Sequence, residues 1–195
     1  MICAIVLAAG QSRRMGVQKL LLPFGKGSVI LHIVDQVLDS FIDEVHVVVG
    51  YEANRIAEQI SDRPVSIVTN PDYESSMLSS VRCGFQSLPQ HCDAVLVALG
   101  DQPSITSELV NEMIQSFKKI NKRILVPLYR GKRGHPILVS IRYRNEIMTC
   151  YDDVGLRGLL RAHPDDIFEM NVSTSGVLSD IDDPEDYQRE LMRDR

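Results

Sequence analysis

The sequence predicts an α/β protein built as a three-layer sandwich, with a mostly parallel sheet between two layers of helices. Two regularities predict it. Short apolar runs rich in β-branched residues recur along the chain, and the segments between them repeat apolar residues about every 3.6 positions. The strand-like runs cover residues 2–7, 45–49, 65–68, 94–99 and 124–128. The helix-like segments cover residues 28–40, 52–60, 77–88 and 106–117. In such folds, ligands bind at the carboxyl ends of the strands.

The regular alternation ends near residue 128. Residues 130–134 have the composition of a turn and residues 136–140 that of a strand, which predicts either a hairpin or a strand that enters the sheet antiparallel. Further elements are expected as short helices at 142–149 and 155–162, a strand at 167–172 and a terminal helix at 185–193. We expect this irregular C-terminal part to shape the site of a second substrate. The whole chain, residues 1–195, has the length of one domain with one core.

Composition argues against several classes of protein. Hydrophobic residues make up 44% and charged residues 24% of the chain, as in ordinary globular proteins, and the net charge of -5 provides no general basic face for nucleic acid. The four cysteines, Cys3, Cys83, Cys92 and Cys150, form no Cys-x-x-Cys pair, so neither a zinc site nor a redox dithiol is indicated. No apolar run approaches the roughly 20 residues of a membrane span, and the chain opens on a strand rather than on a signal peptide. We therefore expect a cytoplasmic protein that binds neither nucleic acid nor membranes.

The opening segment carries the strongest functional signal. The strand at 2–7 runs directly into Ala-Ala-Gly, whose small side chains let backbone N–H groups approach an anion. Arg13, Arg14 and Lys19 follow, and they can supply positive charge for a triphosphate. The spacing is not that of a Walker A loop, and the segment lacks the Gly-x-Gly-x-x-Gly of dinucleotide-binding turns. It predicts a different nucleotide phosphate site; the alternative is a glycine-rich surface turn with incidental basic residues.

Acidic residues form a second signal. Asp101 follows an apolar strand, where a carboxylate is suited to hold Mg²⁺ against a triphosphate, although an Asp that caps a turn is the alternative. Alternation along an extended segment puts Asp180 and Asp182 on one side, from which both could face Asp101 across a nucleotide. Asp183 is expected to cap the terminal helix. The alternative for this late acidic group is a helix start exposed to solvent.

Polar and basic loops form a third signal. Residues 70–80 offer amide and hydroxyl groups to a base or ribose, although their Asn-Pro pair is also an ordinary start of a turn. Residues 130–136 and 153–157 put basic groups on turns in the C-terminal part. These turns suit an anionic second substrate, and exposed loop charge is the alternative.

Taken together, these segments resemble one family, the MobA-like nucleotidyltransferases with a Rossmann-like, GT-A-like fold. The resemblance runs from residue 1 to about residue 187 and includes the opening loop, residues 100–103, 131–136, 153–157 and 180–187. The Leu-Ala-Ala-Gly form of the opening loop and the Arg-Gly-His-Pro segment are similar to the molybdenum cofactor cytidylyltransferase branch of that family. The guanylyltransferase branch usually has Leu-Ala-Gly-Gly instead.

The resemblance implies transfer of CMP from CTP to a molybdopterin-type acceptor with Mg²⁺ as cofactor and release of pyrophosphate. The terminal phosphate of the pterin would attack the α-phosphate, so no protein nucleophile is required. The implied catalytic residues are Arg14, Lys19 and Asp101, and the implied metal ligands are Asp101, Asp180 and Asp182. The implied residues for binding the nucleotide and the acceptor are Leu7, Ala8, Ala9, Gly10, Ser12, Arg14, Lys19, Asn70, Ser80, Gly100, His135 and Arg157.

The chain departs from the family pattern at two positions. Ser76 stands where the family usually has Gly before its Met, and Leu156 stands where Ala is usual, a larger side chain on the acceptor side. Two other functions use similar residues. One is a sugar-1-phosphate or other NTP transferase, and the other is a non-catalytic accessory protein that delivers cofactor to a molybdenum hydroxylase. The resemblance also implies a monomer and a possible molybdenum hydroxylase partner.

Overall fold

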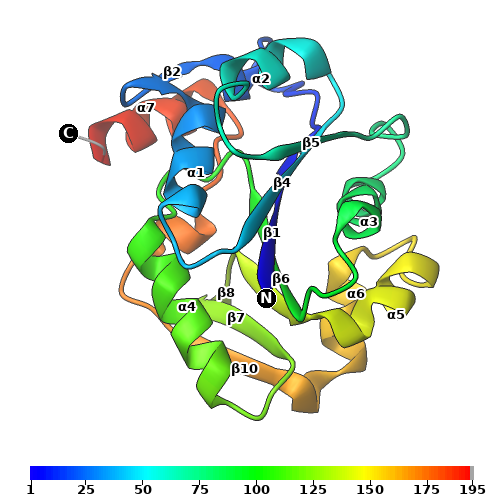
Figure 1. Ribbon diagram of the computed structural model, residues 1–195. Coiled ribbons are helices and arrows are strands. Elements are labelled where there is room, and N and C mark those ends of the chain that lie inside the picture. Colours follow the sequence, from blue (N-terminus) through cyan, green and yellow to red (C-terminus); the bar gives the residue numbers. More distant parts are fainter. Residues whose placement is uncertain (194–195) are drawn as a thin grey trace.

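One mixed sheet organises the computed structural model, which describes residues 1–193 (Figure 1). Its strand order is β10-β7-β9-β6-β1-β4-β5. These strands are β1 (Ile2–Ala8), β4 (Glu44–Val49), β5 (Ser66–Thr69), β6 (Ala94–Leu99), β7 (Ile124–Tyr129), β9 (Ile137–Ser140) and β10 (Ile167–Asn171). β1 pairs parallel with β4 and β6, β4 pairs parallel with β5, and β7 pairs parallel with β10. The predicted, mostly parallel sheet is confirmed.

The C-terminal part extends the sheet beyond β6. β9 enters it antiparallel between β6 and β7. β8 (Lys132–Arg133) forms a hairpin with the end of β7. Both arrangements that the sequence left open for this region therefore occur, one after the other. The chain reverses between β7 and β8 and β9 then starts beside Val97, so the loop between β8 and β9 lies near the carboxyl end of β6.

Helices cover both faces of the sheet (Figure 1). On one face lie α1 (Val29–Leu38), α2 (Ala53–Gln59) and α4 (Ser107–Lys119), with α7 (Pro184–Arg193) beside α1. On the other face lie α3 (Met77–Ser87), α5 (Arg144–Thr149) and α6 (Leu156–Ala162). This is the three-layer sandwich that the sequence predicts. None of the helices within residues 1–193 combines the length and the apolar character needed to span a bilayer.

The sequence of the central strand β1 is apolar at successive positions and does not alternate with polar residues. Successive side chains of a strand point to opposite faces of the sheet. Ala4 and Val6 belong to the core shared with α1 and α4, whereas Cys3 and Ile5 belong to the core shared with α3 and α5. Both faces of β1 are therefore buried, as is typical of parallel sheets covered by helices.

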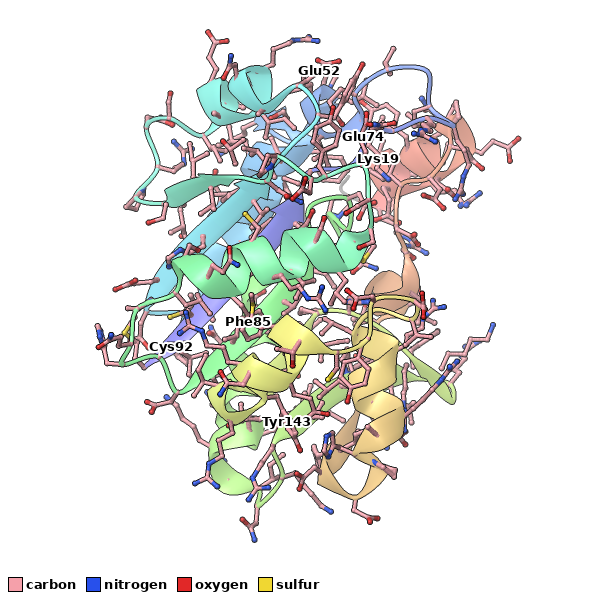
Figure 2. All side chains as sticks on the ribbon, turned by 90° about the vertical axis from the view of Figure 1, so that its right-hand side faces the viewer. Lys19, Glu52, Glu74, Phe85, Cys92 and Tyr143 are labelled. Carbon is pink, nitrogen blue, oxygen red and sulfur yellow. The ribbon has the colours of Figure 1, made fainter. Side chains whose placement is uncertain are left out.

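Phe85 of α3 anchors the second of these cores (Figure 2). Its side chain is 0% exposed. We expect Phe85→Ala to lower the free energy of unfolding by about 3–5 kcal/mol, because it removes apolar contacts and leaves a cavity. Urea denaturation measures this loss. The matched control is Phe41→Ala, whose side chain is 57% exposed and for which we expect a change within about 0.5 kcal/mol. Equal losses in the two variants would contradict the core assignment.

The predicted ends of several elements are wrong. Ser28 lies before α1 and caps it, because its Oγ accepts a hydrogen bond from the Leu31 amide at 3.4 Å. Glu52 precedes α2 with a φ of 53° and lies outside the helix, and Val65 lies outside β5. The helix predicted at 142–149 is divided into η2 (Ile141–Tyr143) and α5. Elements too short to show an apolar period were not predicted: η1 (Lys19–Leu21), β2 (Pro23–Phe24), β3 (Gly27–Ser28), β8, η3 (Pro164–Asp166) and η4 (Ser175–Leu178).

Candidate functional site

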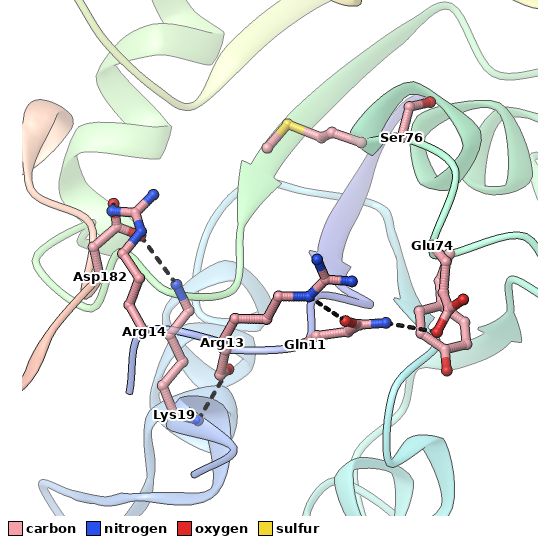
Figure 3. A pocket seen from close by; sticks show the side chains of 10 residues that line it. Gln11, Arg13, Arg14, Lys19, Glu74, Ser76 and Asp182 are labelled. Carbon is pink, nitrogen blue, oxygen red and sulfur yellow. Dashed lines mark hydrogen bonds and ion pairs between the residues drawn. The ribbon is translucent and has the colours of Figure 1, made fainter. Parts of the chain in front are cut away.

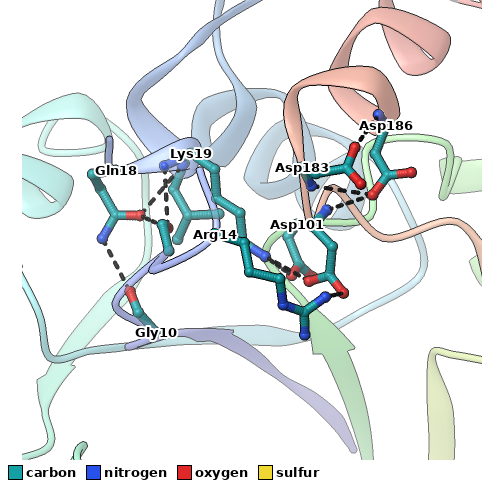
Figure 4. A network of polar contacts seen from close by, with 10 residues as sticks. Gly10, Arg14, Gln18, Lys19, Asp101, Asp183 and Asp186 are labelled. Carbon is teal, nitrogen blue, oxygen red and sulfur yellow. Dashed lines mark hydrogen bonds and ion pairs between the residues drawn. The ribbon is translucent and has the colours of Figure 1, made fainter. Parts of the chain in front are cut away.

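The loop after β1 is held in shape by a buried glutamine, Gln18 (Figure 4). Ser12 Oγ donates to Gln18 Oε1 at 2.7 Å and accepts from the Lys19 amide at 3.2 Å. Gln18 Nε2 donates to the Gly10 carbonyl at 3.1 Å. These bonds close the loop on itself before any ligand binds, and they start η1 at Lys19. The sequence contained Gln18 but gave no signal that it would be buried.

Lys19 connects this loop to two carboxylates (Figure 4). Its Nζ lies 2.5 Å from Asp101 Oδ2 and 3.6 Å from Asp182 Oδ1. Arg14 Nη1 lies 2.5 Å from Asp182 Oδ2. The Lys19 side chain is 13% exposed, whereas that of Arg14 is 73% exposed. The three predicted catalytic residues are therefore brought together, with Lys19 inside the protein and Arg14 at its surface.

The segment before α7 reaches this site through its backbone. The Ile181 amide donates to the Asp101 carbonyl at 2.9 Å. Asp186 Oδ2 accepts from the amides of Asp182 and Asp183 at 3.0 and 3.2 Å. Asp183 Oδ1 in turn accepts from the Asp186 amide at 2.9 Å, as expected for a residue that caps α7. These bonds fix the position of Asp182 beside Lys19.

The predicted metal ligands lie near one another, but they are not arranged as a finished metal site. Within residues 1–193, no group of three His, Cys, Asp or Glu side chains is placed to hold a metal ion. Asp101 and Asp182 contact Lys19 instead. The pKa of Asp180 is raised, mainly because the surrounding protein partly desolvates its carboxyl, and further because Asp101 and Asp182 carry like charges. Lys19 and Arg14 offset part of the negative charge of Asp101 and Asp182, and carboxylate oxygens are the ligand type that hard divalent cations prefer.

Three cavities open around these charges. The first, which we call the loop cavity, has a volume of about 400 Å³. It is lined by Leu7, Ala9, Gly10, Ser12, Arg14, Lys19, Leu20, Tyr73, Ser76, Met77, Ser80, Leu99, Asp101, Asp180 and Asp182. An adjoining cavity of about 420 Å³ shares several of these residues with it and is also lined by Gln11, Arg13 and Glu74 (Figure 3). Arg13 Nε donates to Gln11 Oε1 at 2.6 Å, and Gln11 Nε2 donates to Glu74 Oε1 at 2.7 Å. The loop after β1 is thus tied to the segment before α3 beside this adjoining cavity.

The second cavity, which we call the apolar cavity, has a volume of about 770 Å³. Its walls come from the ends of β1 and β6, from β7 and β9, and from the segment 152–161. His135 and Arg157, both predicted from the sequence, line it. It shares several lining residues with the loop cavity: Leu7, Ser76, Met77, Leu99 and Asp180. The two cavities therefore meet at the carboxyl ends of β1 and β6.

Three predicted site residues lie behind these linings. Ala8 is buried. The Gly100 amide donates to the Leu7 carbonyl at 2.9 Å, and a Cβ at Gly100 would lie 2.9 Å from that same oxygen. Asn70 is also buried, and its Nδ2 donates to the hydroxyls of Ser79 and Ser80 at 2.9 and 3.0 Å. Gly100 lets β1 and β6 approach closely, and Asn70 orients Ser80, which does line the loop cavity.

A sheet of this order, with a closed basic loop after its central strand and carboxylates opposite, has the architecture of GT-A-like nucleotidyltransferases. A nucleotidyl transferase from Methanothermobacter thermautotroptrophicus has this fold, with a TM-score of 0.87, 25% identity and coverage of 100% of this chain and 97% of that one. The Mycobacterium tuberculosis protein Rv0371c, solved in complex with manganese, matches with a TM-score of 0.83, 24% identity and coverage of 98% of each chain.

Residues 4–167 match the MobA-like NTP transferase domain, and the chain belongs to this family of nucleotidyltransferases. Molybdenum cofactor cytidylyltransferase of Escherichia coli (strain K12) is 29% identical over 189 residues, which cover 94% of this chain and 92% of that protein. Nicotine blue oxidoreductase of Paenarthrobacter nicotinovorans is 28% identical over 199 residues, which cover 97% of this chain and 96% of that protein. The resemblance inferred from the sequence motifs is therefore confirmed at the level of the family.

Proposed function

We propose that this protein transfers CMP from CTP to a molybdopterin-type acceptor and releases pyrophosphate. The observation that carries the proposal is the junction of the two cavities, with Asp180 lining both and Lys19 beside Asp101. A nucleotide in the loop cavity and an acceptor in the apolar cavity would meet at this junction. The similarity to the Escherichia coli cytidylyltransferase over nearly the whole chain supports CTP and the molybdopterin acceptor.

In this proposal the residues of the site position the substrates and neutralise the charge of the triphosphate. The backbone of the loop after β1 holds the triphosphate, while Arg14 and Lys19 neutralise it. A phosphate oxygen of the acceptor forms a bond to the α-phosphorus, and the bond from that phosphorus to the bridging oxygen of the β-phosphate breaks. Pyrophosphate leaves with the negative charge that Lys19 stabilises. Catalysis then consists of positioning and electrostatic stabilisation.

Asp101, with Asp180 and Asp182, would hold Mg²⁺ in the proposed enzyme. The carboxylate oxygens of this set suit a hard divalent cation. Bound there, the ion would supply positive charge to the phosphate oxygens. The manganese complex of the Mycobacterium tuberculosis protein supports a divalent cation in proteins of this fold.

We propose that residues 1–195 form one nucleotidyltransferase domain. We further propose that it acts as a cytoplasmic monomer. A molybdenum hydroxylase is the proposed recipient of the finished cofactor.

Pyrophosphate release by the purified protein tests the proposal. Mg²⁺ and molybdenum-loaded molybdopterin are supplied with CTP, GTP, ATP or UTP in parallel. We expect selective release with CTP, whereas selective release with GTP would assign the protein to the guanylyl branch. A parallel reaction replaces molybdopterin with a sugar 1-phosphate, and release only with that acceptor would identify the other NTP transferase reaction. No release with any nucleotide and intact pterin would contradict catalysis on this acceptor and favour the accessory role.

A further inference from the structure

Two stretches that lie far apart in the sequence supply much of the lining of the apolar cavity. One is the start of α3, which contributes Met77, Leu78 and Val81. The other is residues 152–157, the segment that leads from α5 into α6. α5 lies against α3 (Figure 2). Arg82, the residue after Val81 in α3, contacts this second stretch with its side chain.

The guanidinium of Arg82 forms hydrogen bonds at three points around the end of α5. Its Nε donates to the Ile147 carbonyl at 2.9 Å, and its Nη2 donates to the Cys150 carbonyl at 2.8 Å. Its Nη1 lies 2.5 Å from Asp152 Oδ1. One planar group therefore binds two carbonyls at the C-terminal end of a helix and a carboxylate just beyond it. The side chain of Arg82 is only 22% exposed, so water competes weakly for these bonds.

The backbone turns sharply between two of these contacts. Tyr151 has a φ of 77° and lies between two residues that Arg82 binds. A tyrosine in the left-handed region is strained and keeps this conformation only when its surroundings hold it there. Its ring packs on α6, where a Cβ at Gly158 would lie 2.2 Å from a ring carbon. The turn that brings residues 152–157 to the cavity is therefore held by α3 and by α6.

Other bonds of this region stay within the C-terminal part. The Tyr151 hydroxyl donates to Glu146, and His163 Nε2 lies 2.8 Å from Oε1 of the same carboxylate. These bonds join α5 to α6, whereas those of Arg82 cross to α3. Apolar side chains of α3 and α5 also share a core, but apolar packing is non-directional. The bonds of Arg82 give the segment a defined position relative to α3.

The charge of the cavity lining is mixed. Its charged residues in the two C-terminal stretches are Asp152, Asp153, Arg157, Arg161 and Asp180. The Asp152 side chain is 71% exposed, so solvent screens its ion pair with Arg82. The role of Arg82 therefore follows from where it holds the segment rather than from its charge.

We propose that Arg82 is a positioning residue that holds residues 150–155 where they complete the acceptor side of the apolar cavity. The inference rests on the proposed function, which puts the acceptor in this cavity. Without the bonds of Arg82 the segment populates other conformations, and the affinity for the acceptor falls with the fraction of binding-competent protein. A saturating acceptor restores the bound conformation, so the KM for the acceptor rises while kcat is kept.

The test compares Arg82→Gln and Arg82→Lys with Arg142→Gln, a control at an exposed arginine of η2. Arg82→Lys keeps the charge, but an ammonium group does not reproduce the planar fork of a guanidinium. Steady-state pyrophosphate release gives kcat and the KM values for molybdopterin and CTP. We expect the KM for molybdopterin to rise about tenfold in Arg82→Gln and about threefold or more in Arg82→Lys. The KM for CTP and kcat should stay within about twofold in both, and Arg142→Gln should change none of the three.

Amide hydrogen exchange measures the segment itself. We expect faster exchange at residues 150–155 in both Arg82 variants and unchanged exchange in β1. A raised KM for molybdopterin without faster exchange would overturn the inference, because Arg82 would then act other than through the segment. If Arg82→Gln does not fold, the milder Arg82→Lys provides the same comparison.

Two kinetic outcomes would also overturn the inference while leaving the cytidylyltransferase proposal intact. One is an unchanged KM for molybdopterin in the Arg82 variants. The other is an equal rise of the KM values for molybdopterin and CTP, which would show a general loss of structure instead of an effect on the acceptor side. If the original protein releases no pyrophosphate with molybdopterin, the proposed function fails, and the inference fails with it.

Discussion

Lys19→Ala is expected to lower the rate of pyrophosphate release by at least about 10²-fold, as seen when a group that stabilises developing charge is removed. Lys19 is the less exposed of the two cations at the site, and its Nζ lies 2.5 Å from Asp101 and 3.6 Å from Asp182. Without it, two carboxylates would face the triphosphate and the departing pyrophosphate with only the exposed Arg14 to oppose them. Steady-state kinetics with CTP and the molybdopterin acceptor measures the loss.

Two further variants make this result specific. Lys118→Ala removes an exposed lysine of α4 and is expected to leave the rate unchanged. Lys19→Arg keeps the charge but replaces a compact ammonium by a wider guanidinium in a side-chain position only 13% exposed, so we expect only partial recovery. A rate near normal in Lys19→Ala would exclude the proposed charge stabilisation.

Asp101→Asn is the second variant for which we expect a loss of at least about 10²-fold in turnover. The substitution keeps the shape of the side chain and removes one carboxylate from the proposed ligand set. The residual activity should require more Mg²⁺ than the original enzyme does, because one charged ligand is missing. CTP binding without metal should not weaken, since a negative charge has been removed from beside the triphosphate. Pyrophosphate release measured across a series of Mg²⁺ and Mn²⁺ concentrations gives the turnover and the metal requirement. Calorimetry with CTP in the absence of metal gives the binding affinity.

The control is Asp62→Asn, which changes an aspartate that is 72% exposed and pairs with Arg63. We expect it to change neither the rate of pyrophosphate release nor its dependence on metal concentration. An unaltered metal requirement in Asp101→Asn, despite slow turnover, would remove Asp101 from the ligand set. If the original protein binds CTP without turnover and Asp101→Asn merely binds it differently, the accessory role replaces the enzymatic one.

Local sequence patterns were sufficient to predict the segments that form the candidate site. The apolar run of β1 followed by small and basic residues predicted a phosphate loop, and the acid at the end of β6 predicted its counterpart. Parallel strands bring their carboxyl ends to one edge of a sheet, so two such signals predict one site even when about 80 residues separate them. Alternation placed Asp180 and Asp182 on one side of their segment, and both line the loop cavity. Their roles in catalysis and metal binding stay predictions.

Other features of the site depended on packing between distant segments. Gln18 is buried because the loop closes around it, and nothing in its neighbours along the chain predicts this. Asn70 was predicted beside a base or ribose, yet it lies behind the lining, where its amide orients Ser80. The short β2, β3 and β8 have too few residues for a period to appear.

The sequence by itself determined the layer architecture and the family, because apolar periodicity and short-range motifs are local properties of the chain. Only the tertiary structure decided that Lys19 pairs with Asp101 and Asp182, and that an apolar cavity lined by Gln102 and His135 adjoins the loop cavity. The two contacts of Lys19 join its loop to segments about 80 and 160 residues further along the chain. Their geometry is set by how the sheet, the reversal at β9 and the backbone bond from Ile181 to Asp101 pack together, which no local pattern encodes.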